Sequence, residues 1–123
     1  MNTDLSKHGV IDFWDTDTQP YDVEATSPEF YLQRVASETG TLHVEVDSVM
    51  TTASGNIHLE GRLSPDHGWA DLALRSFSDL VAVSSQKSIN TVDVPLAPYV
   101  RISLTNNTPN KPAGGKINVR LGF

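Results

Sequence analysis

Hydrophobic and polar residues alternate along residues 56–63, and a polar turn and a second apolar segment follow. Ile57, Leu59 and Leu63 fall on one side of this alternation at even spacing, which Gly61 interrupts. A period of two indicates a strand with one buried face. A Ser-Pro-Asp-His-Gly turn and Trp69 then lead into residues 70–72. The pattern therefore predicts an antiparallel hairpin.

The same alternation recurs in residues 41–47, 99–105 and 116–123, and a less regular version lies between the first hairpin and residue 95. Residues 30–36 fit two kinds of element. The Ser-Pro-Glu sequence before them is suited to open a helix, whereas their β-rich composition favours a strand, and we expect the strand. About seven or eight short strands at this spacing predict an all-β fold, an antiparallel β-sandwich of jelly-roll kind.

The inward faces of these strands supply the predicted core. A single domain of 123 residues can bury about two thirds of its unfolded surface, so a core of this size is enough for independent folding. The predicted core residues are Leu42, Val44, Val46, Ile57, Leu59, Leu63, Leu72, Val92, Val94, Val100, Ile102, Leu104, Ile117, Val119 and Leu121.

Residues 1–28 differ from the rest of the chain because they are acidic, contain prolines and show no alternation. We therefore divide the chain into an N-terminal arm, residues 1–28, and a β-sandwich domain, residues 29–123. The arm contains one apolar cluster. Its members are Val10, Ile11, Phe13 and Trp14.

The apolar cluster of the arm needs a surface to cover it, because exposing four large apolar side chains near a chain end is unfavourable. It could pack on its own domain or dock across a subunit boundary. We predict the second, so the four cluster residues are the candidate interaction residues. Deleting residues 1–24 should then leave the sandwich folded and weaken assembly or partner binding.

Composition excludes several classes of protein. The chain has no cysteine, which rules out disulfides and thiolate chemistry. With a net charge of −6 and nine dispersed Lys and Arg residues, it offers no basic stripe, and we expect no nucleic-acid partner. No apolar stretch approaches membrane-spanning length, and the first residues lack the pattern of a cleaved export signal. We therefore expect a soluble protein without a membrane partner.

Motifs for catalysis or metal binding are missing from the sequence. The four histidines lack the spacing of a zinc site. His43 and His58 fall on polar faces of strands that could be neighbours, where a solvated pair is expected in preference to a metal site. Asp12, Asp15 and Asp17 lack the glycine and the closing glutamate of a calcium loop. There is no nucleophile elbow and no phosphate-binding glycine loop. We expect no enzyme activity, no cofactor and no metal.

Two aromatic residues, Trp69 and Tyr99, are candidates for stacking on a sugar, because rings on a β-sandwich present flat apolar faces. Trp69 follows a turn at the start of a strand, where a large ring can close the end of the core. We expect Trp69 to pack in the core. A glycan partner remains the competing interpretation.

Two segments carry a resemblance to a known group of proteins. Residues 59–72 read Leu-Glu-Gly-Arg-Leu-Ser-Pro-Asp-His-Gly-Trp-Ala-Asp-Leu, and residues 92–104 read Val-Asp-Val-Pro-Leu-Ala-Pro-Tyr-Val-Arg-Ile-Ser-Leu. A strand and Gly-containing turn before Trp-x-Asp-Leu, followed by an aromatic-x-Arg strand and a short closing strand, resemble small β-sandwich virion proteins of tailed bacteriophages, such as capsid decoration proteins. The resemblance covers residues 41–123 and excludes the arm.

The resemblance implies a non-enzymatic virion structural protein, because members of that group serve as head decoration, fibre or tail-associated modules. It implies synthesis in the host cytoplasm and binding to the major capsid protein on the capsid surface, where the protein stabilises subunit junctions. Symmetric homo-oligomers are the common assembly, and we expect a trimer in preference to a dimer. The alternative is a carbohydrate-binding β-sandwich module of a phage tail fibre or a glycan-active enzyme.

Overall fold

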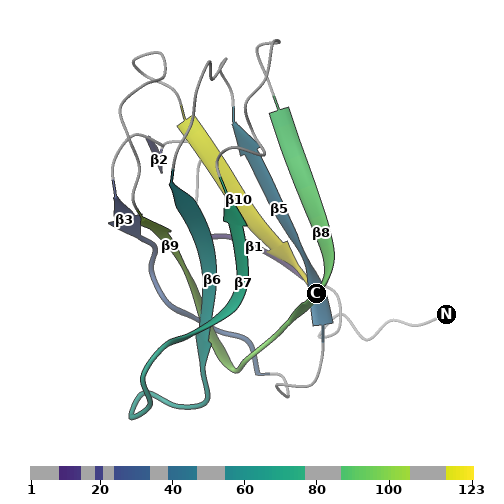
Figure 1. The fold of residues 1–123 in the computed structure, drawn as a ribbon. Coiled ribbons are helices and arrows are strands. Elements are labelled where there is room, and N and C mark those ends of the chain that lie inside the picture. Colours follow the sequence, from purple (N-terminus) through teal and green to yellow (C-terminus); the bar gives the residue numbers. More distant parts are fainter. Residues whose placement is uncertain are drawn as a thin grey trace, which may run out of the picture.

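The computed structural model describes residues 9–14, 19–20, 24–33, 39–46, 55–76, 87–105 and 116–123. In these residues the regular elements are all β-strands. They are β1 (Val10–Asp12), β2 (Gln19–Pro20), β3 (Ala25–Thr26), β4 (Phe30–Tyr31), β5 (Thr39–Val46), β6 (Asn56–Arg62), β7 (Ala70–Ser76), β8 (Lys87–Pro95), β9 (Tyr99–Thr105) and β10 (Lys116–Gly122). The strands form two antiparallel sheets that pack against each other (Figure 1). The predicted all-β antiparallel sandwich is confirmed.

Sheet A has the strand order β1-β10-β5-β8, with β2 also paired to β10, and sheet B has the order β3-β9-β6-β7, with β4 also paired to β9. Figure 1 shows β10, β5 and β8 in one layer and β9, β6 and β7 in the other. If β1 and β2 count as one broken strand, and β3 and β4 as another, sheet A contains the first, eighth, third and sixth strands. Sheet B then contains the second, seventh, fourth and fifth. This is the strand order of a jelly roll.

The core lies between the sheets and follows the alternation of the sequence. Along β6 and β9, buried residues alternate strictly with partly exposed ones. Every predicted core residue is buried except Leu63, Leu72 and Val92. Leu72 is half-buried against the core, whereas Leu63 is 61% exposed and Val92 is 65% exposed. The assignment of Leu63 and Val92 to the core is therefore wrong.

Both errors have a local cause. Leu63 follows the last residue of β6, so it belongs to the turn and the alternation no longer fixes its direction. In β8, Thr91 pairs with Leu42 and Val94 pairs with Gly40, which leaves an irregularity in the register. An extra residue in one strand reverses the faces of the residues beyond it. Val94 is buried for this reason, while Val92 points outward.

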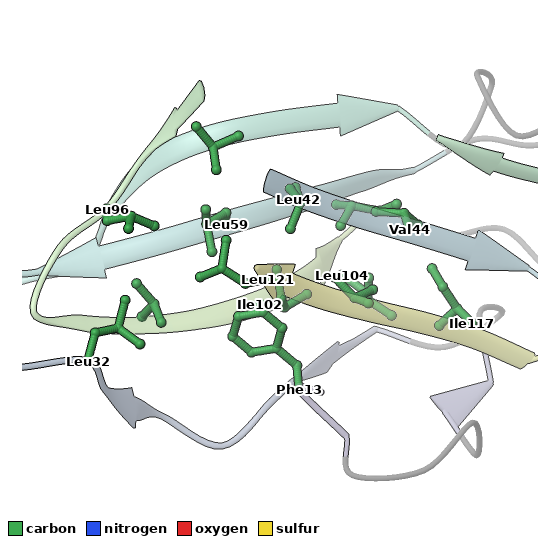
Figure 2. Packing of buried hydrophobic residues seen from close by; sticks show 14 of the residues in the cluster. Phe13, Leu32, Leu42, Val44, Leu59, Leu96, Ile102, Leu104, Ile117 and Leu121 are labelled. Atoms are coloured by element: carbon green, nitrogen blue, oxygen red, sulfur yellow. The ribbon is translucent and has the colours of Figure 1, made fainter. Parts of the chain in front are cut away.

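Several buried residues come from segments between the long strands. They are Phe13, Leu32, Leu96 and Ala97. Figure 2 shows Phe13, Leu32 and Leu96 among the aliphatic side chains of the strands. The Phe13 ring meets the Phe30 ring edge-on, with a centroid distance of 5.5 Å and an interplanar angle of 85°. Both rings come from the first third of the chain, which therefore contributes to the core.

The described part of the predicted arm belongs to the sandwich. In β1, Ile11 pairs with Leu121 of β10, and the Phe13 amide donates to the Val119 carbonyl over 3.1 Å. Gly9 and Phe123 exchange two further backbone hydrogen bonds of 2.6 and 2.9 Å. The division into an arm of residues 1–28 and a domain of residues 29–123 is corrected accordingly, because β1, β2 and β3 all pair within the two sheets.

The apolar cluster of the arm packs on its own domain. Phe13 is fully buried, and Ile11 and Trp14 pack against the core. Val10 is the exception, since it is 71% exposed. Without β1, the β10 strand would have an open edge beside a hydrophobic interior, which is unfavourable. The sequence leaves two placements of this cluster open, packing on its own domain or docking across a subunit boundary. These contacts fit the first. Phe13 cannot be part of a docking surface.

Ser27 joins β3 to β4 across a break in the pairing with β9. Its amide donates to the Ile102 carbonyl over 2.8 Å, and its hydroxyl oxygen accepts from the Ile102 amide over 2.9 Å. The hydroxyl also donates to the Pro28 carbonyl over 2.9 Å. Ser27 is 6% exposed, so its side chain satisfies a buried amide that a regular strand would satisfy with a backbone carbonyl. The predicted strand over residues 30–36 is confirmed only for Phe30–Tyr31, which form β4. Leu32 and Gln33 are not part of a strand, and residues 34–36 lie outside the described residues.

Replacing Ser27 by alanine should lower the free energy of unfolding by about 1–3 kcal/mol, because the Ile102 amide would remain buried without an acceptor. Urea unfolding followed by circular dichroism measures the change. Ser88→Ala is the control, since Ser88 is an exposed serine of a strand, and its effect should stay below about 0.5 kcal/mol. Equal effects of the two substitutions would contradict the role assigned to Ser27.

Candidate functional site: a binding face on sheet B

The outer face of sheet B collects aromatic, charged and hydroxyl side chains. Because inward residues of β6 and β9 are apolar, the residues between them point away from the core. Strand pairing sets Arg62 beside Tyr99, and Glu60 beside Arg101. It also sets Tyr31 of β4 beside Tyr99. We call this surface the binding face. Its residues are Tyr31, His58, Glu60, Arg62, Trp69, Asp71, Tyr99, Arg101 and Thr105.

Aromatic rings and guanidinium groups alternate across the binding face. The Arg62 guanidinium carbon lies 4.4 Å from the ring centroid of Trp69 and 5.9 Å from that of Tyr99. The Arg101 guanidinium carbon lies 4.2 Å from the Trp69 centroid. Tyr31 and Tyr99 follow, with their centroids 4.9 Å apart and their planes tilted by 32°. The contacts between the guanidinium groups and the rings are cation–π interactions, and together with the Tyr31–Tyr99 contact they hold the rings in a continuous row.

The place of Trp69 corrects the prediction that it packs in the core. Trp69 contacts the two arginines and does not belong to the hydrophobic cluster or to the residues packed against it. Trp69 precedes Ala70, the first residue of β7, so the alternation of the strand does not fix its direction. Its contacts with Arg62 and Arg101, which point away from the core, place Trp69 on the outer face.

Acidic groups and carbonyls hold the two arginines in place. Arg62 forms an ion pair with Glu29 and donates hydrogen bonds to the Pro65 and His67 carbonyls over 3.1 and 3.4 Å. Arg101 Nε donates to Glu60 Oε1 over 2.7 Å. Each guanidinium therefore has a carboxylate partner. Fixed side chains lose little further freedom on binding, and the paired charges suit a ligand without a strong charge of its own.

A polar cluster adjoins the row of rings. His58 Nδ1 donates to Asp71 Oδ1 over 3.0 Å, and with that tautomer His58 Nε2 accepts from the Thr105 hydroxyl over 2.8 Å. These two bonds fix the imidazole orientation. The imidazole comes from the middle of β6, and its partners come from the neighbouring strands β7 and β9. Because both imidazole nitrogens are engaged, the cluster offers a ligand the remaining acceptor positions of the Asp71 carboxylate and of the Thr105 hydroxyl.

The conceivable pair of His43 and His58 is not formed. His43 is on β5 of sheet A, where its ring contacts the Asn90 side-chain oxygen, whereas His58 is on β6 of sheet B. Asp12 accepts from the Asn118 amide group over 3.1 Å and lies 3.6 Å from Arg120 Nε, while Asp15 and Asp17 lie outside the described residues. Among the described residues, no three His, Asp or Glu side chains gather as metal ligands would.

Comparison with known proteins gave no matching family model and no matching curated protein. The part of the chain that the structure describes contains no helix able to cross a membrane.

Proposed function

We propose that the protein is a non-enzymatic structural protein of a bacteriophage virion, a head decoration protein that binds the outer capsid surface through the binding face. The row of Tyr31, Tyr99, Arg62, Trp69 and Arg101 carries this proposal. Tyr, Trp and Arg are the residues most enriched at the energetic centres of protein interfaces. Tyr31 is 59% exposed, so its ring is available to a partner.

The fold and the resemblance support the same proposal. Jelly rolls form the domains of many viral capsid proteins and lectins. Residues 59–72 and 92–104, which carry the resemblance to phage virion proteins, contain Trp69, Tyr99 and Arg101 of the binding face. An interface of ordinary size buries on the order of 1,600 Å², and several copies held together gain avidity. A trimer at a threefold position of the capsid fits this mode of binding.

Tyr31→Ala should weaken binding to the capsid by about 10- to 30-fold. Removing a side chain at the energetic centre of an interface costs about 1.4–2 kcal/mol of binding free energy. The measurement is cosedimentation of the purified protein with phage heads that lack it, over a range of protein concentrations. Val92→Ala is the control, since Val92 is 65% exposed on β8 of the other sheet, and it should bind as the unchanged protein does. Unchanged binding by Tyr31→Ala would contradict the use of this face.

A second function, binding of a neutral glycan, is favoured by the position of Trp69 and Tyr99 on the outer face instead of the core. Tyrosine rings can stack on a pyranose, and the carboxylates of Glu60 and Asp71 have further acceptor positions for its hydroxyls. Gel retardation in neutral polysaccharides tests this function. Retardation that Tyr31→Ala abolishes, without binding to heads, would support the glycan module; binding to heads without retardation would support the decoration protein.

A further inference from the structure

A cavity of about 410 Å³ lies on sheet A, where the start of β5 meets the end of β8 and the end of β10. Figure 1 shows these strand ends together near the C-terminus. Polar and apolar atoms share the surface of the cavity, and its volume is in the range of small-ligand pockets. The lining residues used below are Thr39, Gly40, Thr41, Asp93 and Gly122.

A bulge and two glycines shape this cavity. At the register shift between Gly40 and Leu42, β8 has two residues where β5 has one, an arrangement that bends a strand and redirects side chains. A Cβ at Gly40 would lie 2.4 Å from the Gly122 carbonyl oxygen, so this close approach requires glycine. A Cβ at Gly122 would be 3.9 and 4.0 Å from its nearest neighbours, the carbonyl oxygens of Thr41 and Gly9. The space beside Gly122 is therefore open because this residue has no side chain.

Asp93 lies within the bulge in a left-handed backbone conformation, with a φ of 62°. Aspartate adopts this conformation more readily than most residues, but at a cost in free energy, and such positions concentrate at functional sites. Asp93 is exposed, and within the described residues its carboxylate forms no hydrogen bond and no ion pair. The bulge therefore presents a negative charge without a partner cation to the cavity.

Two threonines of β5 add hydroxyl groups to this charge. Gly40 faces the core, because a Cβ there would contact the side chains of Leu96 and Leu121. Thr39 and Thr41, on either side of Gly40, therefore share the outer face of β5. Hydroxyl and carboxylate oxygens both accept hydrogen bonds. The cavity thus combines one charged acceptor group with two neutral ones.

We propose that this cavity binds a primary alkylammonium group, which a lysine side chain or a small free amine carries. An ammonium group has three N–H donors, which match the Asp93 carboxylate and the hydroxyls of Thr39 and Thr41. The apolar part of the cavity surface accommodates the alkyl chain. Asp93 would repel an anion, and a calcium ion would require about six to eight oxygen ligands. The site is on sheet A, whereas the binding face is on sheet B, and it does not depend on the proposed function.

Titration of the isotope-labelled full-length protein with n-butylammonium chloride, followed by nuclear magnetic resonance, tests the proposal. The amide signals of Thr39, Thr41 and Asp93 should shift and reach saturation. The neutral molecule n-butanol has a similar size and should bind about tenfold or more weakly, because its hydrogen bonds to the carboxylate lack the positive charge.

Two further amines separate the possible sources of the ammonium group. They are Nα-acetyl-lysine methylamide and the diamine putrescine. If the lysine derivative binds as tightly as butylammonium, the natural occupant is a lysine side chain of a partner protein. If the lysine derivative is excluded while the diamine still binds, the natural occupant is a free amine.

Asp93→Asn removes the charge and keeps a residue type that tolerates the left-handed conformation. It should weaken binding of butylammonium about tenfold or more. Asp66→Asn is the matched control, since Asp66 is an exposed aspartate in the turn after β6 of sheet B, and it should bind as the unchanged protein does. Gly122→Val places a side chain in the open space and should weaken binding independently. Spectra without ligand report whether each variant is folded.

Three results would overturn the proposal. The first is no shift of these signals with butylammonium, or an equal affinity for n-butanol. The second is binding by Asp93→Asn that is as tight as binding by Asp66→Asn. The third is saturation of the same signals by calcium chloride at lower concentration than by butylammonium, which would indicate a metal site. None of these results would alter the effect of Tyr31→Ala on binding to heads.

Discussion

Replacing Phe13 by alanine should lower the free energy of unfolding by about 3–5 kcal/mol. Phe13 is fully buried, and its ring packs edge-on against Phe30 inside the core. The substitution removes the buried area of a large ring, leaves a cavity and abolishes an aromatic pair, which adds to the loss. Urea unfolding followed by far-ultraviolet circular dichroism measures the difference between the variant and the unchanged protein.

Val10→Ala is the matched control for Phe13→Ala. Val10 belongs to the same segment and pairs with β10, but its side chain is 71% exposed. Exposed substitutions of this kind change stability by less than about 0.5 kcal/mol. If Phe13→Ala had an effect as small as Val10→Ala, the N-terminal segment would not contribute to the core in solution.

The long strands and their buried faces could be predicted from the sequence because burial on one side of a sheet imposes a period of two. Ile57 and Leu59 on β6, and Val100 and Ile102 on β9, follow this period and are buried. The prediction fails at Val92, where the register between β5 and β8 shifts. A bulge of this kind depends on the partner strand. The change of phase between Ile89 and Val92 in the sequence therefore does not by itself show which of these residues point inward.

The position of the apolar cluster of the arm could not be predicted for a related reason. The sequence shows that Ile11 and Phe13 need burial, but it does not show which surface provides it. That surface is β10, at the opposite end of the chain, where Leu121 pairs with Ile11. Pairing between distant segments is decided by which edge remains open once the other strands have formed, and local patterns do not contain this information.

The binding face could be predicted in part. Tyr99 and Arg101 alternate with the apolar residues of β9, so their outward direction follows from the sequence. The direction of Trp69 depends on how the turn after β6 ends. Trp69 lies just before Ala70, the first residue of β7, so the alternation of the strand does not fix its direction. In the sequence it looks like a core residue at the start of a strand, and its contacts with Arg62 and Arg101 place it on the outer face.

Deleting residues 1–24 should destabilise the sandwich strongly, although the sequence alone led to the expectation that the truncated domain would stay folded. The deletion removes β1 and β2, which both pair with β10. It also removes Phe13 from the core. The loss should therefore exceed that of Phe13→Ala, and it approaches the whole stability of an ordinary domain, about 5–15 kcal/mol. Circular dichroism and urea unfolding of the truncated chain measure it.

A synthetic peptide of residues 9–24 provides the control for the deletion. If the truncated chain is unstable because β10 lacks its neighbour and the core lacks Phe13, the added peptide should bind along β10 and restore part of the lost stability. The same peptide with alanine in place of Phe13 should restore less, because burial of the ring supplies much of the binding energy. A truncated chain that unfolds at the same urea concentration as the full chain would show that residues 1–24 are dispensable for folding. The apolar cluster would then be available for docking on a neighbouring subunit or on the capsid.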